Sequence, residues 1–146
     1  MKSLLFICTG NTCRSSMAEV LARQAADTAH LDDWEFASAG ISAVSGAPAS
    51  EHSIRIMAEY GLNLAGHRAR LLNNSLLEAA DLILTMTVYQ RNILAPLAPG
   101  RVYSLLEFAY GMMGDIADPF GGSVDIYRQA AMQIREAVKN VVKLLA

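Results

Sequence analysis

The side chains best suited to chemistry stand near the amino terminus, where five residues separate Cys8 from Arg14. A loop of this length can curl so that its backbone amides point inward and form a nest for a tetrahedral oxyanion. The Arg14 guanidinium adds a planar, two-pronged donor for phosphate oxygens, which a lysine would not reproduce. A helix N-terminus and an arginine also favour the thiolate form of a cysteine. The spacing therefore indicates nucleophilic attack by Cys8 on a bound oxyanion.

The local context favours this interpretation over a structural one, in which Cys8 is an inert cysteine at a strand end and Arg14 a solvated helix residue. An apolar run precedes Cys8, helix-forming residues follow Arg14, and Gly10 and Asn11 lie between them, where a loop needs unusual dihedrals. Ser15, next to Arg14, could donate its hydroxyl to the sulfur and ease its departure from a phosphocysteine.

The other cysteine, Cys13, has two interpretations. It can be a small side chain packed at the start of a helix, or a second thiol that traps an oxidised Cys8 as a reversible disulfide. With two cysteines in the chain, no disulfide framework is available to stabilise the fold. Both thiols are therefore more easily understood as reactive than as structural.

Breaking a phosphate bond also requires a proton for the leaving group, and Asp118 is the candidate donor. It lies in a glycine-rich loop, and the proline that follows biases it toward an extended geometry that projects the carboxyl outward. Asp115 and Asp125 are rivals, which we interpret as a loop residue and as a carboxylate in the first turn of a helix. Asp-Pro on its own is more often a simple turn, so Asp118 needs further support.

The elements that position these residues alternate between strand and helix. Short apolar runs predict strands at 3–7 and 81–86, weak alternation predicts a strand at 34–38, and 101–104 is expected to be a fourth, short strand. Helices are expected at 14–29, 50–60, 88–94 and 123–145. In the second helix, Ser50 is the expected N-cap, the apolar face is Ile54, Met57 and Ala58, and Gly61 ends the helix. For the last helix the apolar stripe is Ile126, Ala130, Ile134, Ala137, Val138, Val141 and Leu145.

This alternation predicts an α/β fold, with a parallel sheet, helices on both faces and right-handed crossovers. Ligands bind such sheets at the carboxyl ends of the strands, where a helix N-terminus offers free N–H groups to an anion. The segment 8–15 lies at that place.

Composition limits the alternatives. A chain of 146 residues predicts a single domain over 1–146, and a formal charge of −2 offers no basic field for nucleic acid. No apolar run approaches the roughly 20 residues of a membrane span, and the start is too short for a signal peptide. We therefore expect a cytoplasmic protein that binds neither nucleic acid nor membrane.

The motif Cys8-Thr9-Gly10-Asn11-Thr12-Cys13-Arg14-Ser15, together with Asp118-Pro119-Phe120, resembles the low-molecular-weight protein tyrosine phosphatases along the whole chain. The motifs 38–40, 67–70 and 81–86 match family positions in order. The resemblance implies a four-stranded parallel sheet of strand order 2-1-3-4, wrapped by helices on both faces in three layers, with no metal and no cofactor. It implies that Cys8 is the nucleophile, Arg14 the phosphate clamp and Asp118 the acid and later the base.

By the same resemblance, the substrate phosphate is held by the loop from Thr9 to Ser15. A hydrogen-bond network of Asn11, Ser15, Ser38 and His67 is expected to hold that loop in its strained shape.

Thr12 suggests a narrower identity. Tyrosine-directed members usually carry a bulky apolar residue there, whereas threonine resembles the bacterial protein-arginine phosphatases of the family, as does the sequence over 115–127. The Thr12 hydroxyl could orient water near the phosphorus, and Phe120 could stack on a guanidinium. Ser16 departs from this branch, where many members have proline, and that change should cost rigidity more than mechanism.

The main hypothesis is therefore a monomeric enzyme that hydrolyses phosphoarginine in cytoplasmic proteins through a phosphocysteine and opposes a protein kinase. A tyrosine phosphatase with the same machinery is the alternative. Arsenate reduction would need cysteines beyond Cys13 to shuttle the disulfide outward. A phosphoprotein-binding module without catalysis would have no need of both Cys8 and Asp118.

Overall fold

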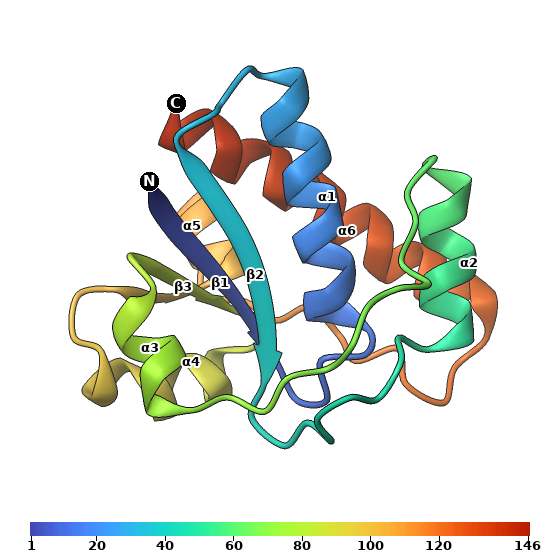
Figure 1. The fold of residues 1–146 in the computed structure, drawn as a ribbon, viewed down its shortest axis with the longest axis horizontal. Helices are drawn as coiled ribbons and strands as arrows, with labels where there is room; N and C mark the ends of the chain where they lie inside the picture. The colour runs from blue at the N-terminus through green and yellow to red at the C-terminus, as the bar shows by residue number, and fades with distance from the viewer.

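The computed structural model describes all residues from Met1 to Ala146. Its centre is a parallel sheet of β1 (Lys2–Cys8), β2 (Trp34–Gly40), β3 (Leu82–Thr85) and β4 (Val102–Ser104), in the order β2-β1-β3-β4 (Figure 1). All four predicted strands are present, and the expected strand order is confirmed. β1 pairs on both sides and is buried, which explains why its sequence is continuously apolar rather than alternating.

The helices lie on both faces of this sheet, as predicted. α1 (Arg14–Thr28), α5 (Leu105–Tyr110) and α6 (Val124–Leu145) pack on one face, with α2 (Glu51–Glu59) against α6. α3 (Asn74–Ala79) and α4 (Val88–Leu94), followed by a short 3₁₀ turn at Ala95–Leu97, lie on the other (Figure 1). The molecule therefore has three layers and a core on each side of the sheet.

Successive residues of β1 show how the sequence divides between these two cores. Leu4 and Phe6 belong to the core under α1 and α6, whereas Leu5 and Ile7 belong to the core under α3 and α4. Because successive side chains of a strand point to opposite faces, a strand covered on both sides must be apolar at every position.

Two short helices are absent from the sequence prediction. α3 begins after Asn73, whose side chain accepts from the Leu76 amide, and α5 begins at a capping box of Ser104 and Glu107. Each helix has six residues, too few for a clear helical period. Their capping residues were nevertheless visible in the sequence.

The predicted apolar faces need two corrections. On α2, Ile56 is buried and Ala58 is exposed, although Ser50 caps the helix as expected. On α6, Ile126 is 46% exposed, whereas Tyr127 is buried. The first turn of α6 is oriented by Tyr127, which packs edge-to-face on His52 of α2. None of the helices combines the length and apolar character of a bilayer span.

Candidate functional site

The chain between β1 and α1 forms a tight loop at the carboxyl end of the sheet (Figure 1). We call residues 9–13 the phosphate loop. Helix α1 has no side-chain cap at its N-terminus, which leaves backbone N–H groups of its first turn for a ligand. An anion placed here would meet both the loop amides and the positive end of the α1 dipole.

Cys8 lies at the base of this loop and is only 2% exposed. Its Sγ is 2.8 Å from Ser15 Oγ, and it accepts from the Asn11 amide at 3.3 Å. Both contacts bring hydrogen-bonding groups to the sulfur of the expected nucleophile. The structure thus brings Cys8 and Ser15 together as expected from their spacing.

Asn11 organises the loop from within. It is fully buried and has a left-handed backbone, with a φ of 58°. Its Nδ2 donates to Ser15 Oγ at 2.8 Å, its Oδ1 accepts from the Arg70 amide at 2.9 Å, and its carbonyl accepts from His67 Nε2 at 2.7 Å. Such a backbone costs free energy and persists where its surroundings fix it. Asn11, Ser15 and His67 therefore form one network around the loop.

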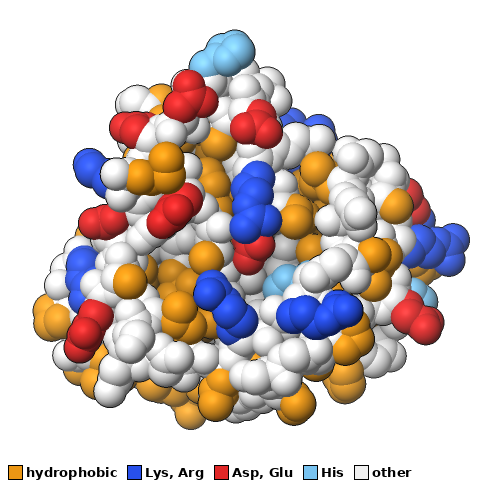
Figure 2. All heavy atoms as spheres, in the orientation of Figure 1, with side chains coloured by type: hydrophobic (Ala, Val, Ile, Leu, Met, Phe, Trp, Pro, Cys, Tyr) orange, Lys and Arg blue, Asp and Glu red, His pale blue; other side chains and the backbone are white.

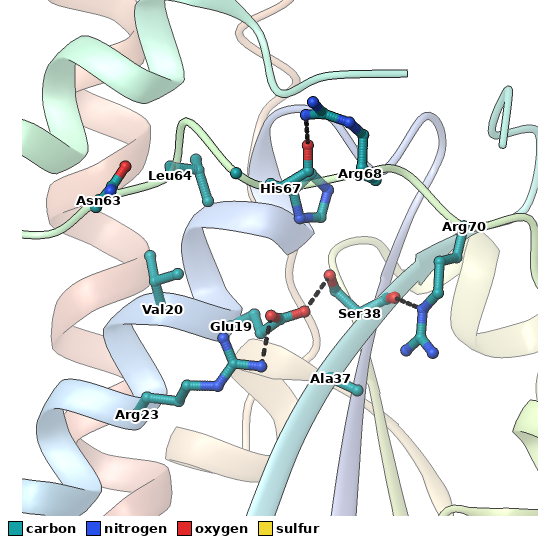
Figure 3. A pocket seen from close by; sticks show the side chains of 11 residues that line it. Glu19, Val20, Arg23, Ala37, Ser38, Asn63, Leu64, His67, Arg68 and Arg70 are labelled. Carbon is teal, nitrogen blue, oxygen red and sulfur yellow. Dashed lines mark hydrogen bonds and ion pairs between the residues drawn. The ribbon is translucent and has the colours of Figure 1, made fainter. Parts of the chain in front are cut away.

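Ser38 lies outside this network, one step from the loop. Its hydroxyl donates to Glu19 Oε1 at 2.7 Å, and its carbonyl accepts from Arg70 Nε at 3.2 Å (Figure 3). Arg70 in turn contacts Asn11 through its backbone amide. Ser38 is thus connected to the loop through Arg70 and has no direct hydrogen bond to it.

Two further residues hold the loop and were not singled out from the sequence. A Cβ on Gly40 would lie 2.6 Å from the Thr9 carbonyl oxygen and 2.9 Å from the Asn11 nitrogen, so only glycine fits there. Gln90 is buried on α4 and donates to Thr9 Oγ1 at 3.2 Å. Both contacts join segments far apart in the chain, and spacing alone could not indicate them.

Arg14 is buried rather than solvated, with 3% exposure. Its Nη1 donates to the Ile116 carbonyl at 2.8 Å, and its Nη2 is 3.6 Å from Asp118 Oδ2. The Asp118 side chain is 50% exposed, and its other oxygen accepts from the Phe120 amide at 3.0 Å. The half-exposed Asp118 carboxylate is therefore held beside the buried Arg14 guanidinium.

The rival carboxylates have other partners. Asp115 Oδ1 accepts from the Val88 amide at the start of α4, at 2.7 Å. Asp125 pairs with Arg128 one turn along α6. Neither lines the cavity that holds Cys8, and Asp118 is the carboxylate that does.

This cavity has a volume of about 240 Å³. Its lining consists of one wall from the phosphate loop and one from the segment before α6: Cys8, Thr9, Gly10, Thr12, Cys13, Arg14, Asp118 and Phe120. The Phe120 ring stands at the rim and is 78% exposed. A cysteine, an arginine and an aspartate around one cavity are the side chains that phosphoryl transfer through a covalent intermediate requires.

Cys13 has its own polar surroundings. Its Sγ lies 3.4 Å from the Tyr127 hydroxyl and 3.6 Å from Ser50 Oγ, and Cys8 and Cys13 are both free thiols. Burial, followed by the contact with Cys13, raises the pKa of Tyr127 to about 12. Tyr127 therefore keeps its proton and anchors Cys13 to α6. No three side chains of His, Cys, Asp or Glu lie close enough together to hold a metal ion.

Comparison with known proteins agrees with this geometry. Residues 3–146 match the family described as low molecular weight phosphotyrosine protein phosphatase. The chain belongs to this family.

Individual members of the family are similar over nearly their whole length. The protein-arginine-phosphatase of Bacillus subtilis (strain 168) is 37% identical over 145 residues, which cover 97% of this chain and 95% of that one. The probable low molecular weight protein-tyrosine-phosphatase EpsP of Ralstonia nicotianae is 36% identical over 138 residues, with coverage of 94% and 92%.

Among solved structures, an arginine phosphatase, YwlE, superposes with a TM-score of 0.93 at 36% identity, covering 98% of this chain and 95% of the other. That protein is a variant in which a phosphorylated serine replaces the active-site cysteine.

Proposed function

We propose that this protein hydrolyses phosphoarginine in proteins. The observation that carries the proposal is Thr12, which lines the cavity together with Cys8, Arg14 and Asp118. A threonine at the wall leaves the cavity without the bulky apolar side chain against which a phenol ring would pack. The similarity to a protein-arginine-phosphatase over nearly the whole chain supports the same substrate.

The reaction follows from the positions of three side chains. The Cys8 thiolate attacks phosphorus, the P–N bond breaks, and Asp118 transfers its proton to the leaving guanidine nitrogen. The loop amides and Arg14 hold the phosphoryl oxygens throughout. Asp118, now ionised, takes a proton from water, whose oxygen attacks the phosphocysteine and releases inorganic phosphate and the thiolate.

Ser15 and Asn11 have supporting roles in this scheme. Ser15 Oγ, at 2.8 Å from Sγ, can donate to the sulfur as it becomes the leaving group in the second step. Because Asn11 Nδ2 donates to the same Oγ, that oxygen is held with its own hydrogen free for the sulfur.

The alternative is hydrolysis of phosphotyrosine with the same machinery. The exposed Phe120 ring at the rim favours it, because an aromatic ring could pack there, and so does the similarity to EpsP. In either case we infer a monomeric enzyme that acts on phosphorylated proteins and opposes a protein kinase.

The deciding experiment compares kcat/KM for a phosphoarginine peptide and a phosphotyrosine peptide, with Cys8→Ser as the blank. We expect phosphoarginine to be preferred. Ready hydrolysis of phosphotyrosine with phosphoarginine left intact would exclude the arginine proposal and retain the alternative.

Two variants of Thr12 separate the effect of its hydroxyl from that of its size. Thr12→Val removes the hydroxyl at nearly constant volume, whereas Thr12→Ile adds apolar bulk as well. If bulk selects the substrate, Thr12→Ile gains phosphotyrosine activity and Thr12→Val does not. If the hydroxyl orients water, both variants lose phosphoarginine turnover to a similar extent.

A further inference from the structure

Charged side chains of both signs are interspersed on the face that carries α1 and β2 (Figure 2). A carboxylate with a particular role must therefore be recognised by its contacts rather than by a patch of like charge. Asp115 is such a carboxylate. It precedes Asp118 by two intervening residues and is exposed, yet its Oδ1 accepts from the Val88 amide at 2.7 Å.

The chain around Asp115 has few other attachments. We call residues 112–118, which form neither helix nor strand, the acid segment. No backbone amide of residues 112–115 donates to another backbone group. Ile116 is the first residue held by its backbone: its amide donates to the Met86 carbonyl and its carbonyl accepts from Arg14 Nη1, both at 2.8 Å. The Asp115 side chain therefore adds an attachment directly before this point.

The partner of Asp115 is well suited to a carboxylate. Val88 is the first residue of α4, and its N–H has no acceptor within the helix. The N-cap residue, Thr87, uses its side chain to accept from the Gln90 amide, which leaves the Val88 amide for Asp115. A negative charge at a helix N-terminus is stabilised by the helix dipole. The acid segment is thus fastened to the start of a helix.

The same turn of α4 is also fastened to the phosphate loop. Gln90 is buried, and its Nε2 donates to Thr9 Oγ1 at 3.2 Å. Thr9 lies on one wall of the catalytic cavity, and Asp118 lies on the other. The first turn of α4 therefore contacts the phosphate loop through Gln90 and the acid segment through Asp115.

We propose that Asp115 is a positioning residue, which holds the acid segment on α4 so that Asp118 can reach the leaving group. The proposal rests on the proposed function, because it takes Asp118 as the acid. Asp115 itself does not line the cavity. A general acid must lie within hydrogen-bond reach of the atom that it protonates, and a displacement of about 1 Å can cost about 10²-fold in rate.

Two variants of Asp115 isolate the hydrogen bond from the charge. Asp115→Ala removes the acceptor, whereas Asp115→Asn keeps an Oδ1 that can accept from Val88, and both remove the negative charge. On the phosphopeptide that the enzyme prefers, Asp115→Ala should lower kcat/KM by about ten-fold or more. Asp115→Asn should stay within about two-fold of the wild type.

A substrate that does not need the acid distinguishes positioning from general damage. With p-nitrophenyl phosphate, whose leaving group requires little protonation, Asp115→Ala should keep kcat/KM within about two-fold of the wild type. In an Asp118→Asn background, Asp115→Ala should cause no further loss on the phosphopeptide, because the two changes act through the same carboxyl.

Asp125→Ala is the matched control, since Asp125 is an exposed carboxylate that pairs with Arg128 and does not line the cavity. It should leave kcat/KM unchanged on both substrates. The proposal is overturned if Asp115→Ala behaves as the wild type, if it slows both substrates equally, or if it further slows Asp118→Asn. Full phosphopeptide activity of Asp118→Asn would overturn the acid assignment itself, and the role of Asp115 with it.

Discussion

Replacing Asn11 tests how the phosphate loop is held. Asn11→Ala removes two side-chain hydrogen bonds, to Ser15 Oγ and from the Arg70 amide. At about 0.5–1.5 kcal/mol each, they contribute about 1–3 kcal/mol to the free energy of unfolding. The variant also places an alanine at a φ of 58°, which adds about 1 kcal/mol. We expect Asn11→Ala to lower the free energy of unfolding by roughly 2–4 kcal/mol.

Urea unfolding of Asn11→Ala and Asn11→Gly separates the two contributions. Glycine loses the same hydrogen bonds but accepts the left-handed backbone, so Asn11→Gly should be the more stable variant by about 1 kcal/mol. His30 offers a matched control because it has a φ of 55° and lies exposed at the end of α1. His30→Gly should likewise exceed His30→Ala by about 1 kcal/mol, without any effect on turnover.

Catalytic activity should depend on the hydrogen bonds that hold the phosphate loop and not on the backbone conformation of residue 11. Both Asn11 variants should lose about ten-fold or more in kcat, because without the Asn11 side chain nothing holds Ser15 Oγ or fixes the backbone N–H of residue 11 that donates to Cys8 Sγ. Equal stability of Asn11→Ala and Asn11→Gly would refute the role of the backbone conformation. Wild-type stability in both would refute the network itself.

Three further outcomes follow from other contacts. Gly40→Ala should lower the free energy of unfolding by about 1–3 kcal/mol and abolish most of the activity, because its Cβ would lie 2.6 Å from the Thr9 carbonyl oxygen. Gly66→Ala, with open space around the added Cβ, should be neutral when both variants are compared by urea unfolding. Asp118→Asn should lower kcat by about 10²- to 10⁴-fold in steady-state assays, with the smallest loss on substrates whose leaving group needs no proton. Burial raises the pKa of Tyr127 from 10.0 to about 12, so the folded state holds this proton more tightly than the unfolded chain does. The resulting stability is present below pH 10 and is lost as the pH rises toward 12. Tyr127→Phe should flatten that part of the pH dependence of urea unfolding.

The sequence was most informative where chemistry and local geometry coincide. Five residues between Cys8 and Arg14, with an apolar run before and a helix after, predicted the loop and its place in the sheet. β1 and β3 were predictable because each is a short apolar run covered on both faces.

Contacts between distant segments could not be predicted in this way. Asp118 was one of three carboxylates until the family motif singled it out, and the structure places it 3.6 Å from Arg14. Gly40 and Gln90 reach the loop only through the packing of β2 and α4, which no local pattern records. Ile126 was assigned to the apolar stripe by period alone, whereas the contact between Tyr127 and α2 sets the rotation of that turn.

The central claim is that Cys8 carries the phosphoryl group during turnover. Rapid-quench mass spectrometry on Asp118→Asn tests it directly with a phosphate ester whose leaving group needs no proton, because loss of the base then slows breakdown of the intermediate more than its formation and lets it accumulate. The account predicts a phosphoryl group on Cys8 that forms with this substrate and disappears as phosphate is released. Phosphate on another side chain, or turnover that persists in Cys8→Ser, would contradict it.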